Sequence, residues 1–503
     1  MIQFSNFQTS YPLVPLEELL ESYIGGDWGI APDKNDAEYV NVKCIRATEL
    51  KNWTTEKAQT AAPRKIKKAS LVKRNLLEGD IVLEISGGGP EQPVGRVEVI
   101  TKEVISSNHG KNLVCTNFFR MLRPNNQVIP KFLKLYLDFF YLCGPIQELQ
   151  SGSNNLRNLK FNDYLKIEVP LPDIERQHSI IQSIEIANGQ IDTGVEALCL
   201  AEKQLELYRQ SVLKDAFEGK LTADWRKANP DLVEPADKLL ARIEAERKAA
   251  HQAESDAWKD AVNQWEVRGK DGKKPSKPKA PHALPTIVDE LSLFEGKIPE
   301  DWFLGTVGHL TNGVEYGTSS KSKKTGSYPV FRMGNLQSGE LTWDDLVFTN
   351  DEAEFKKYEL NSGDVLFNRT NSPELVGKSA IFKGEQPSLF AGYLIRVNQI
   401  DTVCLPEFLN YFLNSSKAKQ YGNLVKTDGV NQSNINGKKL LSYPIPICSI
   451  AEQKEIVLRI QKQCNAIKQN QIMLQKMSQQ SSALKQSILK QAFSGHELLE
   501  DAS

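Results

Sequence analysis

The chain has 503 residues, of which 40% are hydrophobic and 25% charged, a balance typical of a globular protein with roughly two to four folded units. Because 62 Lys and Arg residues face 63 Asp and Glu residues, the net charge of -1 excludes nucleic-acid binding through overall charge and leaves only local patches. Seven scattered cysteines without C-x-x-C spacing, no signal peptide and no long apolar run predict a cytoplasmic protein without disulfides, a zinc site or a membrane span.

The first part of the chain is predicted to fold into short strands around one helix. Runs rich in β-branched and aromatic residues, separated by Gly, Asn and Pro, predict strands at 38–45, 79–86 and 94–100. The apolar run at 130–141 opens with a proline at the first helical position and predicts a helix.

A long helix is predicted next. Asp173 is a good N-cap, apolar residues then recur at three- and four-residue spacing, and Gly219 stands where a glycine would end the helix. This spacing lasts about five heptads and favours a coiled coil, with a helix buried inside a globular domain as the alternative. Beyond it, residues 236–265 are rich in Ala and charged residues and predict a further helix, and 269–285 form a Lys/Pro linker that would not fold alone.

The second half of the chain repeats the first. KQSILKQAFSGH (485–496) matches RQSVLKDAFEGK (209–220) at an offset of 276 residues. Paired segments occur in the same order upstream, including a Gly-Asp strand and a Pro-x-Pro in each half, so the chain is a tandem duplication. The second copy predicts strands at 328–333, 363–368 and 391–397, a helix at 406–416, and a long helix that starts at Ser449 with Glu452 as a capping box and ends at Gly495.

These elements predict an α+β protein with two tandem mixed α/β domains separated by two long α-helices. We infer that the helices pair as an antiparallel coiled coil and that the chain is pseudo-two-fold symmetric, because the helices follow similar domains. The predicted boundaries are 1–173 for the first domain, 174–220 for the first long helix, 221–296 for a central helical and Lys/Pro region, 297–447 for the second domain, and 448–503 for the second long helix and tail.

No catalytic signature is found in the sequence. Gly377-Lys378-Ser379 resembles the end of a P-loop, but Ser372 replaces the required glycine. The Asp80/Glu84 pair lacks the following lysine that metal-dependent nucleases often have, and the six histidines are isolated. We therefore expect no catalytic residue, no metal site and no cofactor on this chain.

Binding chemistry remains. Cations cluster in the first domain and more sparsely in the second, as phosphate contacts require. The loops 86–96 and 368–378 and the Asn-rich turns 151–158 and 427–434 recur at matching places, where Gly allows close backbone approach and Asn and Arg can discriminate bases. Solvated loops and ordinary turn chemistry are the alternatives. The candidate DNA-binding residues are Arg46, Arg64, Lys65, Lys67, Lys68, Ser86, Gly87, Gly88, Arg96, Asn154, Asn155 and Arg157 in the first half, and Lys321, Lys323, Lys324, Arg332, Asn335, Arg369, Asn371, Lys378, Asn431, Gln432 and Asn434 in the second.

The two Gly-Asp strand units, the two Pro-x-Pro segments and the two QSxLKxAFxG helices together resemble the specificity subunits of type I restriction–modification enzymes. LKDAFEGKLTADWRKANPDL (213–232) looks especially like the central region of enterobacterial-type members. The resemblance covers nearly the whole chain, although the 221–296 region is longer and more basic than a minimal spacer.

The resemblance implies a non-catalytic subunit with two target recognition domains, each reading one half of a split, asymmetric target in double-stranded DNA, while the helices set the gap. It further implies two methyltransferase subunits, which bind S-adenosylmethionine, and two restriction/translocase subunits, which use ATP and Mg²⁺. Adenine methylation and DNA cleavage would then reside on those partners. A coiled-coil adaptor that binds only protein and a stand-alone restriction or methylation enzyme are the alternatives.

Overall fold

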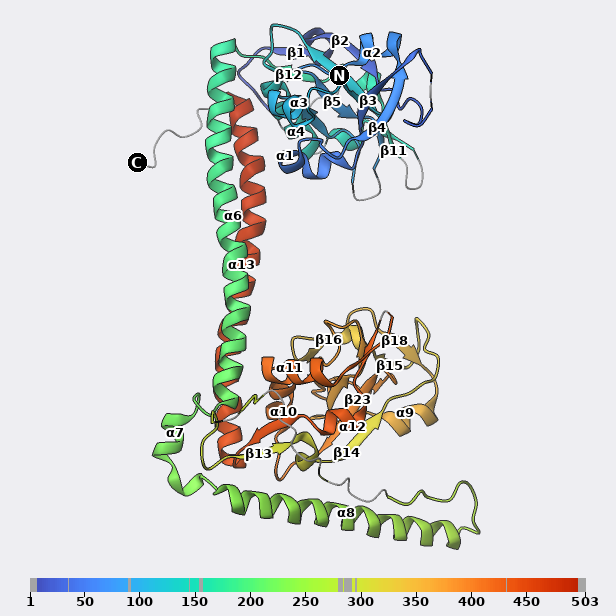
Figure 1. The fold of residues 1–503 in the computed structure, drawn as a ribbon, viewed down its shortest axis with the longest axis vertical. Coiled ribbons are helices and arrows are strands. Elements are labelled where there is room, and N and C mark those ends of the chain that lie inside the picture. Colours follow the sequence, from blue (N-terminus) through green and yellow to red (C-terminus); the bar gives the residue numbers. More distant parts are fainter. Residues whose placement is uncertain are drawn as a thin grey trace. The chain divides into compact units, whose positions relative to one another are not determined.

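The chain divides into two units, Met1–Leu200 with Leu474–Ser503 (unit 1) and Ala201–Met473 (unit 2). The computed structural model describes residues 7–495 apart from 35, 89–91, 144, 153–156, 279–283, 285–291, 295 and 431. Each unit contains one mixed α/β domain together with parts of the two long helices, α6 (Ile174–Phe217) and α13 (Ile450–Ser494) (Figure 1). The predicted fold class is confirmed.

Within the described residues, the domain of unit 1 has four small sheets, five α-helices and three short 3-10 helices. The sheets have the strand orders β1-β12, β2-β9-β5-β7, β4-β3-β8 and β10-β11-β6. The strands are β1 (Leu13–Pro15), β2 (Leu20–Gly25), β3 (Tyr39–Ile45), β4 (Ala62–Lys67), β5 (Ile81–Glu84), β6 (Ser86–Gly87), β7 (Val97–Val99), β8 (Leu113–Cys115), β9 (Phe119–Pro124), β10 (Gln150–Ser151), β11 (Arg157–Leu159) and β12 (Glu168–Pro170). The helices are α1 (Trp53–Glu56), α2 (Lys68–Arg74), α3 (Lys102–Ser107), α4 (Pro130–Leu142) and α5 (Phe161–Tyr164).

The domain of unit 2 repeats these sheets as β13-β26, β14-β23-β19-β21, β18-β15-β22 and β24-β25-β20, and extends the second of them with the β17-β16 hairpin. The strands are β13 (Phe303–Thr306), β14 (Thr311–Tyr316), β15 (Tyr328–Phe331), β16 (Leu336–Gln337), β17 (Glu340–Leu341), β18 (Val347–Thr349), β19 (Val365–Asn368), β20 (Thr370–Asn371), β21 (Ser379–Ile381), β22 (Leu389–Phe390), β23 (Leu394–Gln399), β24 (Thr427–Asp428), β25 (Ser433–Asn434) and β26 (Pro444–Ile447). The helices are α9 (Glu352–Tyr358), α10 (Pro406–Leu413), α11 (Ser416–Val425) and α12 (Gly437–Leu441).

Each long helix begins with a buried glutamine that ties it to the domain before it. In unit 1, Gln177 Nε2 donates to the carbonyls of Pro172 (2.9 Å) and Gln127 (3.1 Å), and its Oε1 accepts from Ile129 N (2.8 Å). In unit 2, Gln453 Nε2 donates to the carbonyls of Cys448 (3.0 Å) and Val403 (2.9 Å), and its Oε1 accepts from Leu405 N (3.0 Å). The same carboxamide thus fixes the helix start to the segment that leads into α4 or α10.

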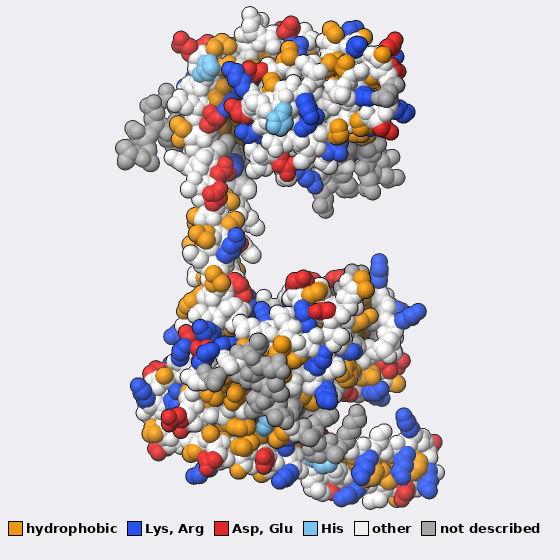
Figure 2. All heavy atoms as spheres, viewed as in Figure 1, with side chains coloured by type: hydrophobic (Ala, Val, Ile, Leu, Met, Phe, Trp, Pro, Cys, Tyr) orange, Lys and Arg blue, Asp and Glu red, His pale blue; other side chains and the backbone are white. Residues whose placement is uncertain are grey.

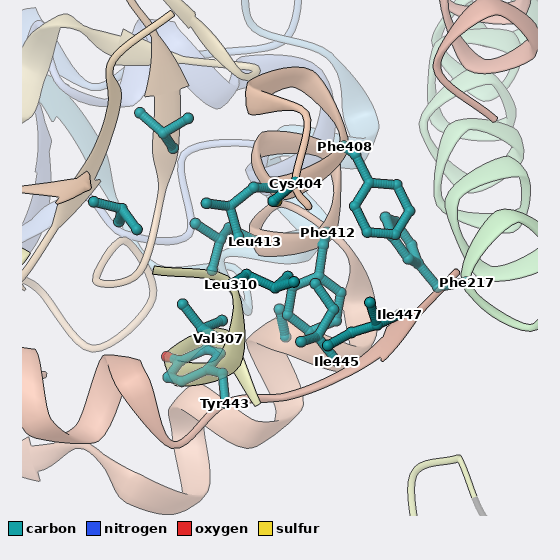
Figure 3. Packing of buried hydrophobic residues seen from close by; sticks show 14 of the residues in the cluster. Phe217, Val307, Leu310, Cys404, Phe408, Phe412, Leu413, Tyr443, Ile445 and Ile447 are labelled. Atoms are coloured by element: carbon teal, nitrogen blue, oxygen red, sulfur yellow. The ribbon is translucent and has the colours of Figure 1, made fainter. Parts of the chain in front are cut away.

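Each long helix ends with a buried phenylalanine in the other unit's domain. Phe493 of α13 packs on Phe132, Tyr136 and Phe139 of α4, with ring centroids 5.2–5.8 Å away. Phe217 of α6 packs in the same way on Phe408 and Phe412 of α10, at 5.2 and 5.3 Å (Figure 3). Each domain is therefore held by the first turns of one long helix and the last turns of the other.

The helices pair antiparallel within both units. In unit 1, Lys485 Nζ lies 2.5 Å from Asp192 Oδ1, while the later residue Leu489 shares a core with the earlier residue Ile184. In unit 2, Tyr208 Oη donates to Gln463 Oε1 at 3.1 Å, and Val212 shares a core with Ile460. The inferred antiparallel pairing is confirmed.

Both helix ends close as the glycine pattern predicts. Gly219 and Gly495 have φ values of +69° and +86°, the left-handed region that favours glycine. A β-carbon on Gly219 would lie 2.4 Å from Pro299 Cγ, and one on Gly495 would lie 1.9 Å from Ser10 Oγ. The chain that enters each domain therefore packs against the helix end, which leaves no room for a side chain.

The helix starts match their predicted caps only in part. Asp173 accepts from Arg176 N (2.8 Å), and Ser449 Oγ accepts from Glu452 N (3.2 Å). The reciprocal half of the predicted capping box is wrong, because the buried Glu452 carboxylate has other partners. It accepts from Thr222 Oγ1 (2.7 Å), Arg226 Nη2 (2.6 Å) and Trp302 Nε1 (2.9 Å), which joins the segment after α6 to the start of α13.

The central region adds α7 (Ala223–Ala228) and the predicted helix, α8 (Ala236–Val267). Leu239 and Ile243 of α8 belong to the core of unit 2. The part of the Lys/Pro segment at 269–278 contacts the end of α8, where Trp258 Nε1 donates to Pro275 O (3.1 Å) and Trp265 Nε1 donates to Gly272 O (3.0 Å). Two indoles of the preceding helix thus hold residues 272–275 against it.

The aromatic contacts at the helix ends predict large and local effects of truncation. Phe493→Ala should destabilise unit 1 by about 3–5 kcal/mol, because it empties a buried aromatic site. Hydrogen exchange should rise first in α4, and Phe217→Ala should have the same effect on α10. Leu207→Ala, at a side chain that is 71% exposed on α6, is the matched control and should change stability by less than about 0.5 kcal/mol. Equal protection of α4 in Phe493→Ala and in the control would contradict this role of Phe493.

Candidate nucleic-acid interface

Two loops that are distant in sequence meet in a small sheet in unit 1. Ser86 pairs with Asn158 and Gly87 with Arg157, so β6 from the glycine-rich loop joins β11 from the Asn-rich turn. Gly87 has a φ of +125°, which lets the backbone turn directly after the strand. The structure thus brings together the two segments that the sequence singled out separately. Asn154 and Asn155 lie outside the described residues.

Unit 2 forms the same sheet from the equivalent segments. Thr370 pairs with Asn434 and Asn371 with Ser433, and Asn434 Nδ2 donates to Thr370 Oγ1 at 2.8 Å. Next to this pair lies a cavity of about 620 Å³ lined by Thr370, Thr427, Asp428, Gly429, Val430, Gln432, Ser433 and Asn434. Asn431 lies outside the described residues. Hydroxyl and amide groups at the surface of the cavity are suited to hydrogen bonds with base edges or phosphates.

Arg369 connects the second small sheet to the main sheet of its domain. Its guanidinium lies 4.8 Å from the centre of the Tyr316 ring, and Nη1 donates to Gly392 O at 3.4 Å. Its Nε is buried without a hydrogen-bond partner among the described residues. Arg369 is therefore oriented by an aromatic ring while much of its donor capacity remains available for a ligand.

Arg96 and Lys378 are the last residues of the loops 86–96 and 368–378, which we call the recognition loops, and they differ in their partners. Arg96 donates from Nε to Glu84 Oε2 (2.8 Å) and from Nη2 to Glu84 Oε1 (2.7 Å), and the carboxylate is buried. Lys378 Nζ donates only to Gln337 Oε1, at 3.3 Å, within the part of the chain that the structure describes. Arg96 therefore stabilises the base of its own loop, whereas the Lys378 ammonium can reach a phosphate.

The basic run of the first domain lies on β4 and α2 and is not a loop. Arg64 stacks on Trp28 at 4.2 Å and donates from Nε to Trp28 O (3.0 Å), while Lys65 Nζ donates to Lys34 O (2.7 Å). Lys67 and Lys68 are exposed. In the second domain Lys321, Lys323 and Lys324 are all exposed, and Lys323 forms an isolated bridge with Phe348.

Three predicted contact residues have structural partners instead. Arg46 forms a bidentate pair with the buried Glu49. Arg332 Nη2 donates to Asp345 O at 2.7 Å. Asn335 is 3% exposed, and its amide donates to the carbonyls of Thr342 and Asp344. Because the donors of Asn335, Arg46 and Arg96 are already used, we remove Asn335 from the candidate interface and regard Arg46 and Arg96 as supports of the surrounding loops. Arg332 is only partly used, since its Nε has no hydrogen-bond partner among the described residues.

Sequence reasoning missed the aromatic partners of the arginines. Trp28, Tyr316 and Phe161 each lie below a guanidinium, the last at 4.1 Å from Arg120. Each pair joins residues at least 36 positions apart, so no local spacing could indicate them. On the face shown in Figure 2, Lys and Arg side chains are interspersed with Asp and Glu, in accord with the balanced net charge.

Two other ionisable side chains, His309 and Cys44, have pKa values that burial shifts away from their ordinary range. Burial, together with the nearby Arg247, lowers the pKa of His309 to about 4, and His309 Nδ1 accepts from Thr306 N at 3.0 Å. Burial raises the pKa of the Cys44 thiol to about 12. In the described part of the chain, no three His, Cys, Asp or Glu side chains gather as a possible metal site. No helix among the described residues combines the length and apolar character that a membrane crossing needs.

Known proteins resemble this chain over most of its length. A family model described as the type I restriction modification DNA specificity domain matches residues 299–475. The chain is 24% identical over 462 residues to the type I restriction enzyme EcoKI specificity subunit of Escherichia coli (strain K12), covering 90% of this chain and 81% of that protein. It is 31% identical over 191 residues to the type I restriction enzyme EcoBI specificity subunit of Escherichia coli, covering 36% of each.

A solved structure has the same fold. It comes from work on complex assembly and conformational transition of the type I R-M system. The match has a TM-score of 0.59 at 15% identity and covers 98% of this chain and 100% of that one.

Because Arg96 pairs with Glu84 and Lys378 has no such partner, substitution of these two equivalent residues should have different effects on stability. Arg96→Ala should destabilise unit 1 by about 3 kcal/mol, because it leaves a buried carboxylate unpaired. Lys378→Ala should stay within about 0.5 kcal/mol of the parent, because its side chain has one long hydrogen bond. Urea unfolding, followed by hydrogen exchange of β5 and β19, measures both. The double variant Glu84→Leu/Arg96→Leu should lose less than Arg96→Ala; an equal loss would mean that the charge pair is not the cause.

Proposed function

The chain belongs to the family of type I restriction–modification specificity subunits, and on this premise we propose that each of its two domains reads one half of a bipartite, asymmetric DNA target. The chain recognises DNA sequence as a component of a type I complex. One observation supports the finer proposal: each domain forms an equivalent three-stranded sheet from its own two loops, which are distant in sequence. Because both copies lie in one chain, the two sheets can differ in sequence, so the target need not be palindromic.

We assign base reading to the small sheets with the adjacent Arg369, and phosphate contact to exposed and half-buried cations. The base-reading set is Ser86, Gly87, Gly88, Arg157, Arg369, Asn371, Gln432 and Asn434, with Asn154, Asn155 and Asn431 kept from the sequence. The phosphate-contacting set is Arg64, Lys65, Lys67, Lys68, Lys321, Lys323, Lys324 and Lys378. Arginine and asparagine can contact bases through two hydrogen bonds, whereas lysine acts on phosphate as a point charge.

The long helices are proposed to set the gap between the half-targets and to dock two methyltransferase subunits. Support comes from large apolar side chains that stay exposed along both helices, among them Ile186, Leu200 and Leu207 on α6 and Leu458, Met473 and Leu484 on α13. Two restriction/translocase subunits would complete the assembly. S-adenosylmethionine, ATP and Mg²⁺ would bind to those partners, and this chain would be non-catalytic.

Exchange of one domain tests the proposed function directly. Residues 300–440 are replaced by the equivalent domain of a relative, and the methylated sites of a host that expresses the full complex are mapped. One half of the methylated target should change, and the other half and the gap should stay the same. Changes in both halves, or in neither, would show that the domains do not read separate half-targets.

Substitution of Arg369 and of Lys378 should lower the affinity for DNA in different ways. Arg369→Ala should cost about 1–3 kcal/mol on the cognate duplex and much less on random duplexes, because a base contact is lost. Lys378→Ala should weaken binding to all duplexes alike and lower the salt dependence by about one ion. Equal losses of Arg369→Ala on cognate and random DNA would make Arg369 a phosphate contact.

A heptad inserted into both helices tests the spacing role. Insertion after Leu198 and after Leu474 keeps the apolar seam and lengthens each helix by about 10 Å, equivalent to roughly 3 base pairs. Sites selected from a random library should then have a longer gap between unchanged half-targets. Affinity should fall as well, since roughly 3 base pairs rotate one half-target by about 100° around the DNA axis. An unchanged gap in tight binders would mean that these helices do not set it.

A further inference from the structure

The two recognition loops are closed by the same backbone bonds. Glu84 and Asn368 are the last residues of β5 and β19, at the N-terminal base of the loops 86–96 and 368–378. Glu84 N donates to Arg96 O at 2.9 Å, and Asn368 N donates to Lys378 O at 2.8 Å. Both side chains lie at the base of the loop and are fully buried. The two sites therefore have equivalent backbone bonds but different side chains.

In unit 1 the side chains complete the closure. The Glu84 carboxylate accepts two hydrogen bonds from Arg96, at 2.7 and 2.8 Å, across the base of the loop. A bidentate charged pair of this kind restricts both the distance and the orientation of the two residues. The two ends of the segment after β5 are thus joined by a charged side-chain pair as well as by a backbone bond.

In unit 2 the equivalent side chains do not pair. Neither Oδ1 nor Nδ2 of Asn368 has a hydrogen-bond partner among the described residues, although the side chain is fully buried. Lys378 turns to Gln337 instead. Buried amides without any partner are uncommon in folded proteins, because burial removes their bonds to water without replacement.

The neighbouring Arg369 shows the same pattern. Its backbone is fixed, since Arg369 N donates to Tyr393 O (3.0 Å) and Ile435 N donates to Arg369 O (2.9 Å). Its side chain has one long bond of 3.4 Å and an unpartnered Nε. At the start of the second loop, therefore, the backbone is in place while two consecutive polar side chains have unused capacity.

We propose that Asn368 is a positioning residue whose carboxamide becomes hydrogen-bonded only when the loop 369–377 closes on its half-target. A carboxamide presents one kind of donor and one kind of acceptor, the pair that a peptide backbone in the loop can match. The first domain then meets its half-target with the base of its loop already joined by a side-chain pair, and the second completes its loop on the DNA. This inference rests on the proposed function.

The test separates the stability of the free protein from half-target binding. Asn368→Leu keeps the side-chain size and removes both polar atoms. Since the free protein loses only unsatisfied groups, its Tm should be equal to or higher than that of the parent. Affinity of the full chain for a duplex selected from a random library by the parent should fall about tenfold. On a duplex whose second half-target is scrambled, the parent and the variant should bind equally.

A second variant places the Glu84–Arg96 pair of the first domain at the equivalent positions of the second. Asn368→Glu/Lys378→Arg installs the residues of unit 1 and should raise the Tm. Selection from the library should lose its preference in the second half-target only, because the loop 369–377 can no longer bond the Asn368 carboxamide. The control Glu84→Gln should lower the Tm, because it weakens an existing pair.

Three outcomes would overturn the proposal. One is an Asn368→Leu variant that fails to fold or melts earlier, because the carboxamide would then already be satisfied in the free protein. Another is an equal loss on both duplexes. The third is an unchanged second half-target in Asn368→Glu/Lys378→Arg. A parent chain that selects no bipartite sequence at all would instead reject the proposed function.

Discussion

The buried carboxamides of Gln177 and Gln453 fix the geometry on which both domains depend. Each amide satisfies one carbonyl and one N–H of a loop, together with a carbonyl just before its own helix, groups that would otherwise be buried without partners. The loop in question leads into α4 or α10, the helices that carry the aromatic core of each domain. The first turn of a long helix is therefore part of its domain, and the small recognition sheets are built on a frame that includes it.

The phenylalanines at the opposite helix ends add a second constraint. Phe493 completes the core of the first domain and Phe217 that of the second, so neither core is filled by the helix that follows it alone. The hydrophobic core of each domain is therefore complete only when both helices are present and run antiparallel. This explains why the residues of the QSxLKxAFxG repeat are so alike, since both copies perform one packing task in equivalent aromatic sites.

The sequence predicted the scaffold better than the site. Duplication, periodicity and capping residues indicated the long helices and their antiparallel pairing, because these signals are local or repeated. The helix predicted at 406–416 is in fact α10 and α11, because Ser415 caps a new helix by accepting from Ala418 N at 3.3 Å. The roles of Arg46, Arg96 and Asn335 could not be predicted, because a cation or an amide that stabilises a loop and one that binds DNA have the same local sequence.

Duplication separates what must stay constant from what can change. The glutamine and phenylalanine contacts occupy the helix ends, and any change there would disturb a packed core. The loop bases lie at the ends of β5 and β19, where only the backbone bonds are shared and where Asn368/Lys378 occupy the positions of Glu84/Arg96. A loop whose ends are fixed by backbone bonds tolerates new side chains without loss of register. Divergence of the two readers therefore requires no change in the frame that holds them.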